Sequence, residues 1–138
     1  MIEISVVSPI LNEEETILKF LEKLNDTLKD LNVSYEIVLV LDPCTDNTEK
    51  ILFEEANKNK LIKIITLSRR FGQPAATLAG LSHANGNYVV VIDSDLQDPP
   101  ELIKDLYKKI CTGYDVVYAE REKRYGENVI KKLISGRL

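Results

Sequence analysis

The sequence predicts an α/β fold in which a mostly parallel sheet lies between two layers of helices. Short apolar segments typical of strands alternate with longer segments whose apolar residues recur at helical spacing. Clusters of polar residues follow the apolar segments directly, as they do at the carboxyl ends of parallel strands. The expected strands cover residues 2–8, 35–41, 62–67, 88–92 and 115–119.

Three of the expected helices carry an N-terminal capping signature. Asn12, Asp46 and Asp98 each stand three residues before a glutamate, which is the spacing of a capping box. Pro99 adds a residue suited to the first helical position. We therefore expect helices to begin near these residues, after the first, second and fourth strands.

Two further helices are predicted from composition and spacing alone. An alanine-rich helix suited to close packing on a sheet should begin at Gln73 and Pro74 and run to residue 84. Residues 127–138 have apolar side chains at helical spacing, with lysines between them, and predict a last helix. Its apolar face would need a partner, so we expect self-association into a homo-oligomer, or disorder, at this end of the chain.

Composition and charge are those of an ordinary soluble globular domain. The chain has 138 residues, of which 44% are hydrophobic and 29% charged, so residues 1–138 are expected to form a single domain with its own core. The net charge is −4 and no basic stripe carries interleaved aromatic residues, which argues against nucleic-acid binding. No apolar run is long enough to span a bilayer and no signal peptide precedes the first strand, so a cytoplasmic location is expected.

The cysteines and the histidine suggest no site of their own. Cys44 and Cys111 lack metal-ligand spacing, which favours a reduced intracellular protein. For Cys44, which follows the second strand, a small filler is preferred to a nucleophile because no base is nearby. His83 stands alone in an expected helix, where a structural or surface role is preferred to a zinc site or a catalytic triad.

The most informative stretch is the strand that ends in Asp93-Ser94-Asp95. Its β-branched run, residues 89–92, is typical of a strand buried on both faces. In an extended backbone Asp93 and Asp95 project to the same side, at the strand end where open α/β sheets bind ligands. Two such carboxylates repel each other unless a cation lies between them, and Mg²⁺ suits that place. The alternative is a role in turns and caps, which is preferred for Asp98.

The sequence excludes two common ways of binding phosphate through glycine-rich loops. Residues 8–13, after the first strand, contain no glycine, so the dinucleotide fingerprint is absent, and there is no P-loop. A metal that bridges acidic side chains to phosphate is therefore expected. The charged residues that should gather along one edge of the sheet are Glu13, Asp42, Arg69, Asp93 and Asp95.

Several motifs in chain order resemble family 2 glycosyltransferases. Residues 8–14 (SPILNEE) are similar to the opening of that family, and residues 93–95 (DSD) match its DXD motif. Four further segments resemble one branch of the family, namely residues 67–72, 95–101, 113–118 and 121–127. This branch includes dolichyl-phosphate mannose synthases and bacterial enzymes that glycosylate undecaprenyl phosphate. The resemblance covers essentially the whole chain, and it implies a GT-A fold, a nucleotide-sugar donor, and Mg²⁺ or Mn²⁺ as cofactor.

The resemblance also implies which residues form the site. Those that would contact the nucleotide sugar come from the first two strand ends, the DXD motif and the end of the fifth strand: Pro9, Leu11, Glu13, Val40, Asp42, Asp93, Ser94, Asp95 and Arg121. Those that would bind the metal are Asp93, Asp95 and Gln97. Catalysis would depend on the two aspartates and on Arg121, which would neutralise the diphosphate with help from Arg124. A solvated basic surface is the alternative for both arginines.

Three departures from the family pattern leave the choice of base open between uracil and guanine. Leu11 stands where an aromatic residue often stacks on the base. Leu41 and Asp42 replace the usual pair of aspartates, and Pro43 and Cys44 replace the common Gly-Ser. Val40 and Asp42 are nevertheless the residues that the resemblance places against the base.

The activity that the resemblance implies is inverting transfer of a hexose from a UDP- or GDP-sugar to a polyprenyl phosphate, in cell-envelope glycan biosynthesis. The acceptor phosphate is already anionic, so little general-base help is needed. The alternatives are a soluble transferase that acts on a polysaccharide or protein, and a nucleotide-binding fragment without activity. Family members continue past the point that matches Leu138, so we expect the acceptor half and any membrane segment to be missing. The intact protein is expected on the cytoplasmic face of the membrane.

Overall fold

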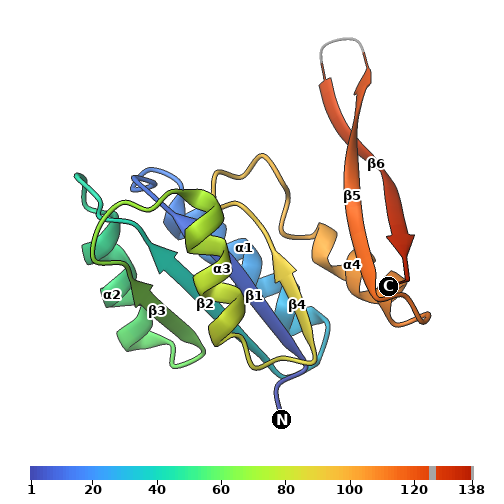
Figure 1. The fold of residues 1–138 in the computed structure, drawn as a ribbon, viewed down its shortest axis with the longest axis horizontal. Coiled ribbons are helices and arrows are strands. Elements are labelled where there is room, and N and C mark those ends of the chain that lie inside the picture. Colours follow the sequence, from blue (N-terminus) through green and yellow to red (C-terminus); the bar gives the residue numbers. More distant parts are fainter. Residues whose placement is uncertain (125–126, 138) are drawn as a thin grey trace. The chain divides into compact units, whose positions relative to one another are not determined.

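The computed structural model describes the backbone of residues 1–124 and 127–137, and the side chains of residues 1–121 and 133–137. The chain forms two compact units, residues 1–100 and residues 101–138 (Figure 1). The first unit is built around a four-stranded parallel sheet with the strand order β3-β2-β1-β4. Its elements are β1 (Ile4–Ile10), α1 (Ile17–Asp30), β2 (Tyr35–Leu41), α2 (Thr48–Lys58), β3 (Ile62–Thr66), α3 (Gln73–His83) and β4 (Tyr88–Val91).

The strand order explains which face each helix covers. The chain moves outward from β1 to β2 and β3 and then returns past β1 to β4. Right-handed crossovers therefore place α1 and α2 on one face of the sheet and α3 on the other. Figure 1 shows α3 in front of the sheet and α1 behind it. The four predicted parallel strands and the helix that begins at Gln73 are confirmed, and so is the α/β fold class.

The two faces of the sheet are packed differently. On one face α1 buries large apolar side chains, and Phe20 and Leu24 are fully inaccessible to solvent. On the other face α3 packs small residues, with Ala76 buried against Val7 and its neighbours. A Cβ atom on Gly80 would lie only 2.3 Å from Val7 Cγ1, so the backbone of α3 approaches the sheet too closely for a side chain at that position.

In the described part of the chain, β4 is an edge strand of the parallel sheet. Val89 and Val91 are 40% and 48% exposed, so the expectation of a strand buried on both faces is wrong for β4. The reason is that α3 covers β1 and β2 and leaves this face of β4 open. An apolar run predicts a strand, but it does not determine where in the sheet the strand lies.

A buried polar network lies at the amino-terminal end of the sheet, away from the strand ends that were expected to bind ligand. The Glu36 side chain is 1% exposed and accepts hydrogen bonds from Ser5 Oγ (2.6 Å) and the Asn85 N–H (2.7 Å), while Lys63 forms an ion pair with it. Ser5 Oγ accepts in turn from the Gly86 N–H (2.7 Å). Burial alone would raise the pKa of Glu36, but the hydrogen bonds from Lys63, Ser5 and Asn85 lower it to about 2. The network ties the turn before β4 to β1 and β2.

The second unit consists of α4 (Leu102–Ile110) and an antiparallel hairpin of β5 (Val116–Arg124) and β6 (Glu127–Gly136). The helix expected over residues 127–138 is therefore wrong. The apolar residues of this segment fit helical spacing, which is why a helix was expected. Pairing with β5 instead satisfies the backbone hydrogen bonds of the segment, and its β-branched residues suit a strand. The strand expected over residues 115–119 is confirmed, in this hairpin rather than in the parallel sheet.

Some expectations fall on positions whose side chains lie outside the described residues. They are Arg124, Val129, Ile130, Lys131, Lys132 and Leu138. Within the part of the chain that is described, no helix is long and apolar enough to cross a bilayer.

Of the three expected helix caps, Asn12 and Asp98 are wrong, whereas Asp46 accepts a hydrogen bond from the Thr48 N–H (2.9 Å) at the start of α2. The helices begin later, with Thr16, Asn47 and Glu101 at the cap positions of α1, α2 and α4. For α4 the reason is local, because a residue that precedes proline disfavours the helical conformation, and two prolines in succession delay the start of the helix.

For α1 the reason is that Asn12 binds the loop after β2, and Asp46 in turn binds the loop after β1. Asn12 lies in the left-handed region (φ 51°), and its Oδ1 accepts a hydrogen bond from the Thr45 N–H (2.8 Å). Asp46 accepts from the N–H of Glu14 (3.3 Å) and of Thr48 (2.9 Å). The loops after β1 and β2 are thereby joined at the carboxyl edge of the sheet.

Candidate functional site

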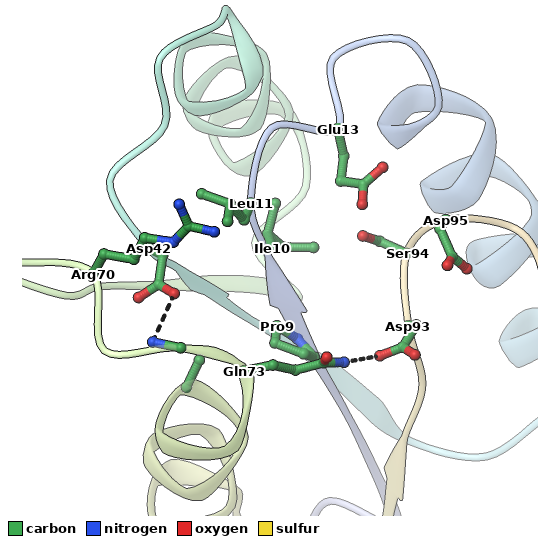
Figure 2. A pocket seen from close by; sticks show the side chains of 12 residues that line it. Pro9, Ile10, Leu11, Glu13, Asp42, Arg70, Gln73, Asp93, Ser94 and Asp95 are labelled. Atoms are coloured by element: carbon green, nitrogen blue, oxygen red, sulfur yellow. Dashed lines mark hydrogen bonds between the residues drawn. The ribbon is translucent and has the colours of Figure 1, made fainter.

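A pocket of about 300 Å³ lies at the carboxyl ends of β1, β2 and β4 and at the start of α3. All of its lining residues belong to the first unit. Figure 2 shows their side chains converging from the strand ends on one space. They are Pro9, Ile10, Leu11, Glu13, Asp42, Arg70, Gly72, Gln73, Ala76, Asp93, Ser94 and Asp95.

The end of β1 supplies one wall of the pocket. Pro9 and Leu11 line it directly, as expected. Glu13 is held from two sides, because its N–H donates to Thr48 Oγ1 (2.8 Å) and its Oε2 accepts from Thr16 Oγ (3.1 Å). In Figure 2 the Glu13 carboxylate points across the pocket toward Ser94. The β1 residues predicted to contact the nucleotide sugar therefore lie together in one cavity.

The segment after β4 supplies the opposite wall. Asp93, Ser94 and Asp95 all line the pocket, and Ser94 is 2% exposed. Asp93 Oδ1 accepts a hydrogen bond from Gln73 Nε2 (2.6 Å), and Asp95 Oδ1 accepts from the Gln97 N–H (3.0 Å). Because β4 ends at Val91, the regular alternation of an extended strand does not reach Asp93 and Asp95, and only their place in the pocket lining is common to them.

The two aspartates fit a metal that arrives together with a phosphate ligand. No group of three or more His, Cys, Asp or Glu side chains that could hold a metal occurs among the described residues. Mg²⁺ commonly binds through one or two carboxylates, several waters and the oxygens of a substrate phosphate, so a complete cage of protein ligands is not required. The side chain of Gln97 does not line the pocket, although its N–H restrains Asp95.

Asp42, at the end of β2, both lines the pocket and anchors the loop before α3. It is 4% exposed, and its two carboxylate oxygens accept hydrogen bonds from the N–H groups of Phe71 (3.3 Å) and Gly72 (3.2 Å). Gly72 has φ 91°, a conformation that favours glycine, and it stands at the cap position of α3. Asp42 therefore determines where α3 begins relative to β2.

Arg70 and Gln73 line the pocket, and neither was singled out from the sequence. Both lie in or beside the segment 67–72 that carried part of the family resemblance, which was the available signal. Arg69, expected at the edge of the sheet, instead lies over the Phe71 ring at 4.1 Å from its centroid and does not line the pocket.

Two other predicted residues lie away from the pocket lining. Val40 is completely buried in the core cluster beneath α3, so the structure does not bring its side chain to the pocket. Arg121 lies on β5 in the second unit, where it is exposed, and its predicted contact with the diphosphate stays a prediction.

Cys44 lies between the loops after β1 and β2 without the properties of a nucleophile. Burial raises the pKa of the Cys44 thiol, and the carboxylates of Asp46, Glu49 and Asp42 raise it further, against the opposing effect of the Asn12 N–H. Because the thiolate is the reactive form, this supports the interpretation of Cys44 as a small filler.

Comparison with known proteins gives a consistent family assignment. Residues 5–137 match the family model described as Glycosyl transferase family 2. An uncharacterized glycosyltransferase of Synechocystis sp. is 46% identical over 131 residues, which are 95% of this chain and 41% of that protein. The undecaprenyl-phosphate 4-deoxy-4-formamido-L-arabinose transferase of Proteus mirabilis is 44% identical over 124 residues, 88% of this chain and 38% of that protein. The chain thus spans about two fifths of the length of these relatives.

Solved structures of glycosyltransferases share the fold. A mannosyltransferase from Pyrobaculum calidifontis, in complex with GDP-Man and Mn²⁺, aligns with a TM-score of 0.70 at 22% identity, over 83% of this chain and 34% of that one. Glucosyl-3-phosphoglycerate synthase from Mycobacterium tuberculosis, in complex with Mn²⁺, UDP and glucosyl-3-phosphoglycerate, aligns with a TM-score of 0.60 at 28% identity, over 80% of this chain and 40% of that one. The predicted GT-A type of α/β fold is thereby confirmed.

Proposed function

The chain belongs to glycosyl transferase family 2, and from that premise we propose that it is the donor-binding part of an inverting transferase. The donor is a UDP- or GDP-hexose, and the acceptor of the whole protein is a polyprenyl phosphate on the cytoplasmic face of a membrane. The observation that carries the proposal is the pocket in which Glu13, Asp42 and the Asp93–Asp95 segment converge at one edge of a parallel sheet. This edge is where open α/β sheets bind nucleotides.

Asp93 and Asp95 are proposed to hold Mg²⁺ or Mn²⁺ together with the donor diphosphate. Support comes from the two carboxylates in one pocket and from the similar synthase, which was solved with Mn²⁺ and UDP. When bound, the cation stabilises the negative charge that develops on the departing nucleoside diphosphate. The Arg70 guanidinium lines the same pocket and offers a fixed positive charge to the donor, as Arg121 was predicted to do.

Pro9, Leu11, Glu13 and Ser94 are proposed to hold the nucleoside. Pro9, Leu11 and Glu13 form the wall from β1, and Ser94 faces them across the cavity. None of the aromatic side chains that the structure describes lines this pocket. Binding of the base therefore depends on apolar contact and hydrogen bonds rather than on stacking.

The polyprenyl phosphate acceptor is proposed from chemistry and from one relative. The Proteus relative is an undecaprenyl-phosphate transferase at 44% identity. A phosphate oxygen is a nucleophile at neutral pH without a general base. Direct attack of that oxygen on the anomeric carbon expels the nucleoside diphosphate and inverts the configuration.

The proposal is tested by calorimetry of UDP, GDP and their sugars, with and without Mn²⁺. Changing a group that only orients a metal ligand costs roughly 10–100-fold in metal affinity. Asp95→Asn changes a proposed ligand itself, so the loss of metal-dependent affinity should be larger. Asp26→Asn, on the exposed surface of α1, is the matched control and should leave the affinity unchanged. Unaltered metal-dependent binding in a folded Asp95→Asn variant would contradict the assignment.

A further inference from the structure

We propose that Gln73 is a positioning residue of the donor site: it holds Asp93 in the orientation that the metal requires, and Asp42 supports Gln73 by fixing the start of α3. The inference rests on the proposed function and adds to it a pocket residue that acts through Asp93 rather than as a ligand of the metal. It also assigns Asp42 a role in addition to lining the pocket.

The contact between Gln73 and Asp93 joins two elements that are distant in sequence. Gln73 is the first residue of α3, and Asp93 follows β4, yet Gln73 Nε2 lies 2.6 Å from Asp93 Oδ1. An ionised carboxylate only accepts hydrogen bonds, so the amide NH₂ group is the part of Gln73 that faces it. Figure 2 shows this hydrogen bond crossing one side of the pocket. A hydrogen bond to a charged acceptor is among the stronger kinds in proteins.

The backbone at the start of α3 is restrained by Asp42. Its carboxylate accepts from the N–H groups of Phe71 and Gly72, the two residues directly before Gln73. The Gly72 carbonyl accepts the first backbone hydrogen bond of the helix, from the Ala76 N–H (3.1 Å). The position of Gln73 is therefore set by the end of β2, and the Gln73 side chain transmits it to the segment after β4.

This arrangement prepares Asp93 for a cation in two ways. The hydrogen bond on Oδ1 restricts rotation of the carboxylate, so less conformational freedom is lost when a metal binds. A neutral amide also orients the carboxylate without adding a positive charge that would repel the metal, as a lysine would. Groups that hold a metal ligand in this manner typically account for about 10–100-fold in metal affinity.

The experiment measures binding of UDP and GDP to the whole chain by calorimetry, once with Mn²⁺ and once with a chelator. Gln73→Ala removes the donor, and Gln73→Met keeps the length of the side chain but cannot donate. Both should weaken the Mn²⁺-dependent affinity by about 10–100-fold and leave the metal-free affinity unchanged. Both variants lose a hydrogen bond to a charged carboxylate, so a small fall in the melting temperature is expected, and binding is measured at a temperature where each variant is folded. Asn57→Ala, an exposed amide on α2, is the matched control.

Each outcome separates this inference from the proposed function. If the wild-type chain binds with metal and Gln73→Ala binds equally well, Gln73 is not a positioning residue, although the proposed function stands. If Gln73→Ala weakens metal-free binding to the same degree, Gln73 contacts the nucleotide itself and the inference is wrong. If the wild-type chain shows no metal-dependent binding, the proposed function fails and the inference with it. In an Asp93→Asn background Gln73→Ala should cause no further loss, and an additional loss would contradict action through Asp93.

Discussion

Glu36 shows how hydrogen bonds make the ionised form of a buried carboxylate favourable in this fold. Burial disfavours its charge, but Lys63, Ser5 and the Asn85 N–H all interact with the ionised form. Its pKa is therefore about 2, against 4.5 for an unperturbed glutamate. Because the unfolded chain takes up the proton first as the pH falls, this group stabilises the fold fully above pH 4.5 and loses its contribution toward pH 2.

Glu36→Gln should reveal this contribution in urea-unfolding experiments. At pH 7 we expect the free energy of unfolding to fall by about 1.5–3 kcal/mol, the usual value of hydrogen bonds to a charged group. The difference from the wild type should shrink when the measurement is repeated at pH 3, since the wild-type chain is then losing the same interaction. Glu22→Gln, exposed on α1, serves as the control. Parallel pH dependences of wild type and Glu36→Gln would show that the network is not linked to stability.

Helix α3 connects packing to the site at the level of an element. Gly72 at its start lets the chain adopt φ 91°, and Gly80 lets the helix lie directly on Val7 and Val40. The same helix places Gln73 beside Asp93, with which it forms a hydrogen bond. The height of α3 above the sheet therefore sets both the core on this face and one wall of the pocket.

Gly80→Ala should destabilise the first unit although alanine favours a helix. The new Cβ would lie 2.3 Å from Val7 Cγ1 and 3.0 Å from Val40 Cγ2. Overpacking of this kind costs about 1–3 kcal/mol, and thermal or urea unfolding measures it. Adding Val7→Ala removes the nearest atoms and should recover part of the loss, whereas Ser82→Ala on the exposed side of α3 should change little. A Gly80→Ala variant as stable as the wild type would mean that α3 moves outward without cost.

The molecule as a whole divides its predicted site residues between two units. The pocket is lined entirely by the first unit, whereas Arg121 lies on β5 of the second. A nucleoside diphosphate is strongly anionic, and Arg70 is the cationic side chain that lines the described pocket. The first unit therefore contains both the acidic residues proposed to hold a metal and one positively charged side chain in the same pocket.

Arg70→Ala should weaken binding of UDP and GDP by about tenfold, which corresponds to roughly 1.4 kcal/mol for a partly solvated charge. The remaining affinity should depend less on salt, because one ionic contact is lost. Arg69→Ala is the matched control, since Arg69 lies on the Phe71 ring and outside the pocket lining. Equal losses in the two variants would indicate a general effect of surface charge rather than a contact in the pocket.

The sequence by itself determined the four parallel strands, the family and the part of the site that lies directly at strand ends. Strand periodicity and the DXD segment are local patterns, so Pro9, Glu13, Asp93 and Asp95 could be placed on the pocket edge without coordinates. The family and the fold class are confirmed by the comparisons.

Only the tertiary structure decided which side chains meet across the loops. Asp42 binds N–H groups 29 and 30 residues away, and Gln73 binds a carboxylate 20 residues away, so no local pattern contains these contacts. The choice between Arg69 and Arg70 depends on how the loop before α3 is held. The segment 127–136 became a strand because β5 pairs with it, and such pairing outweighs an apolar spacing that fits a helix equally well.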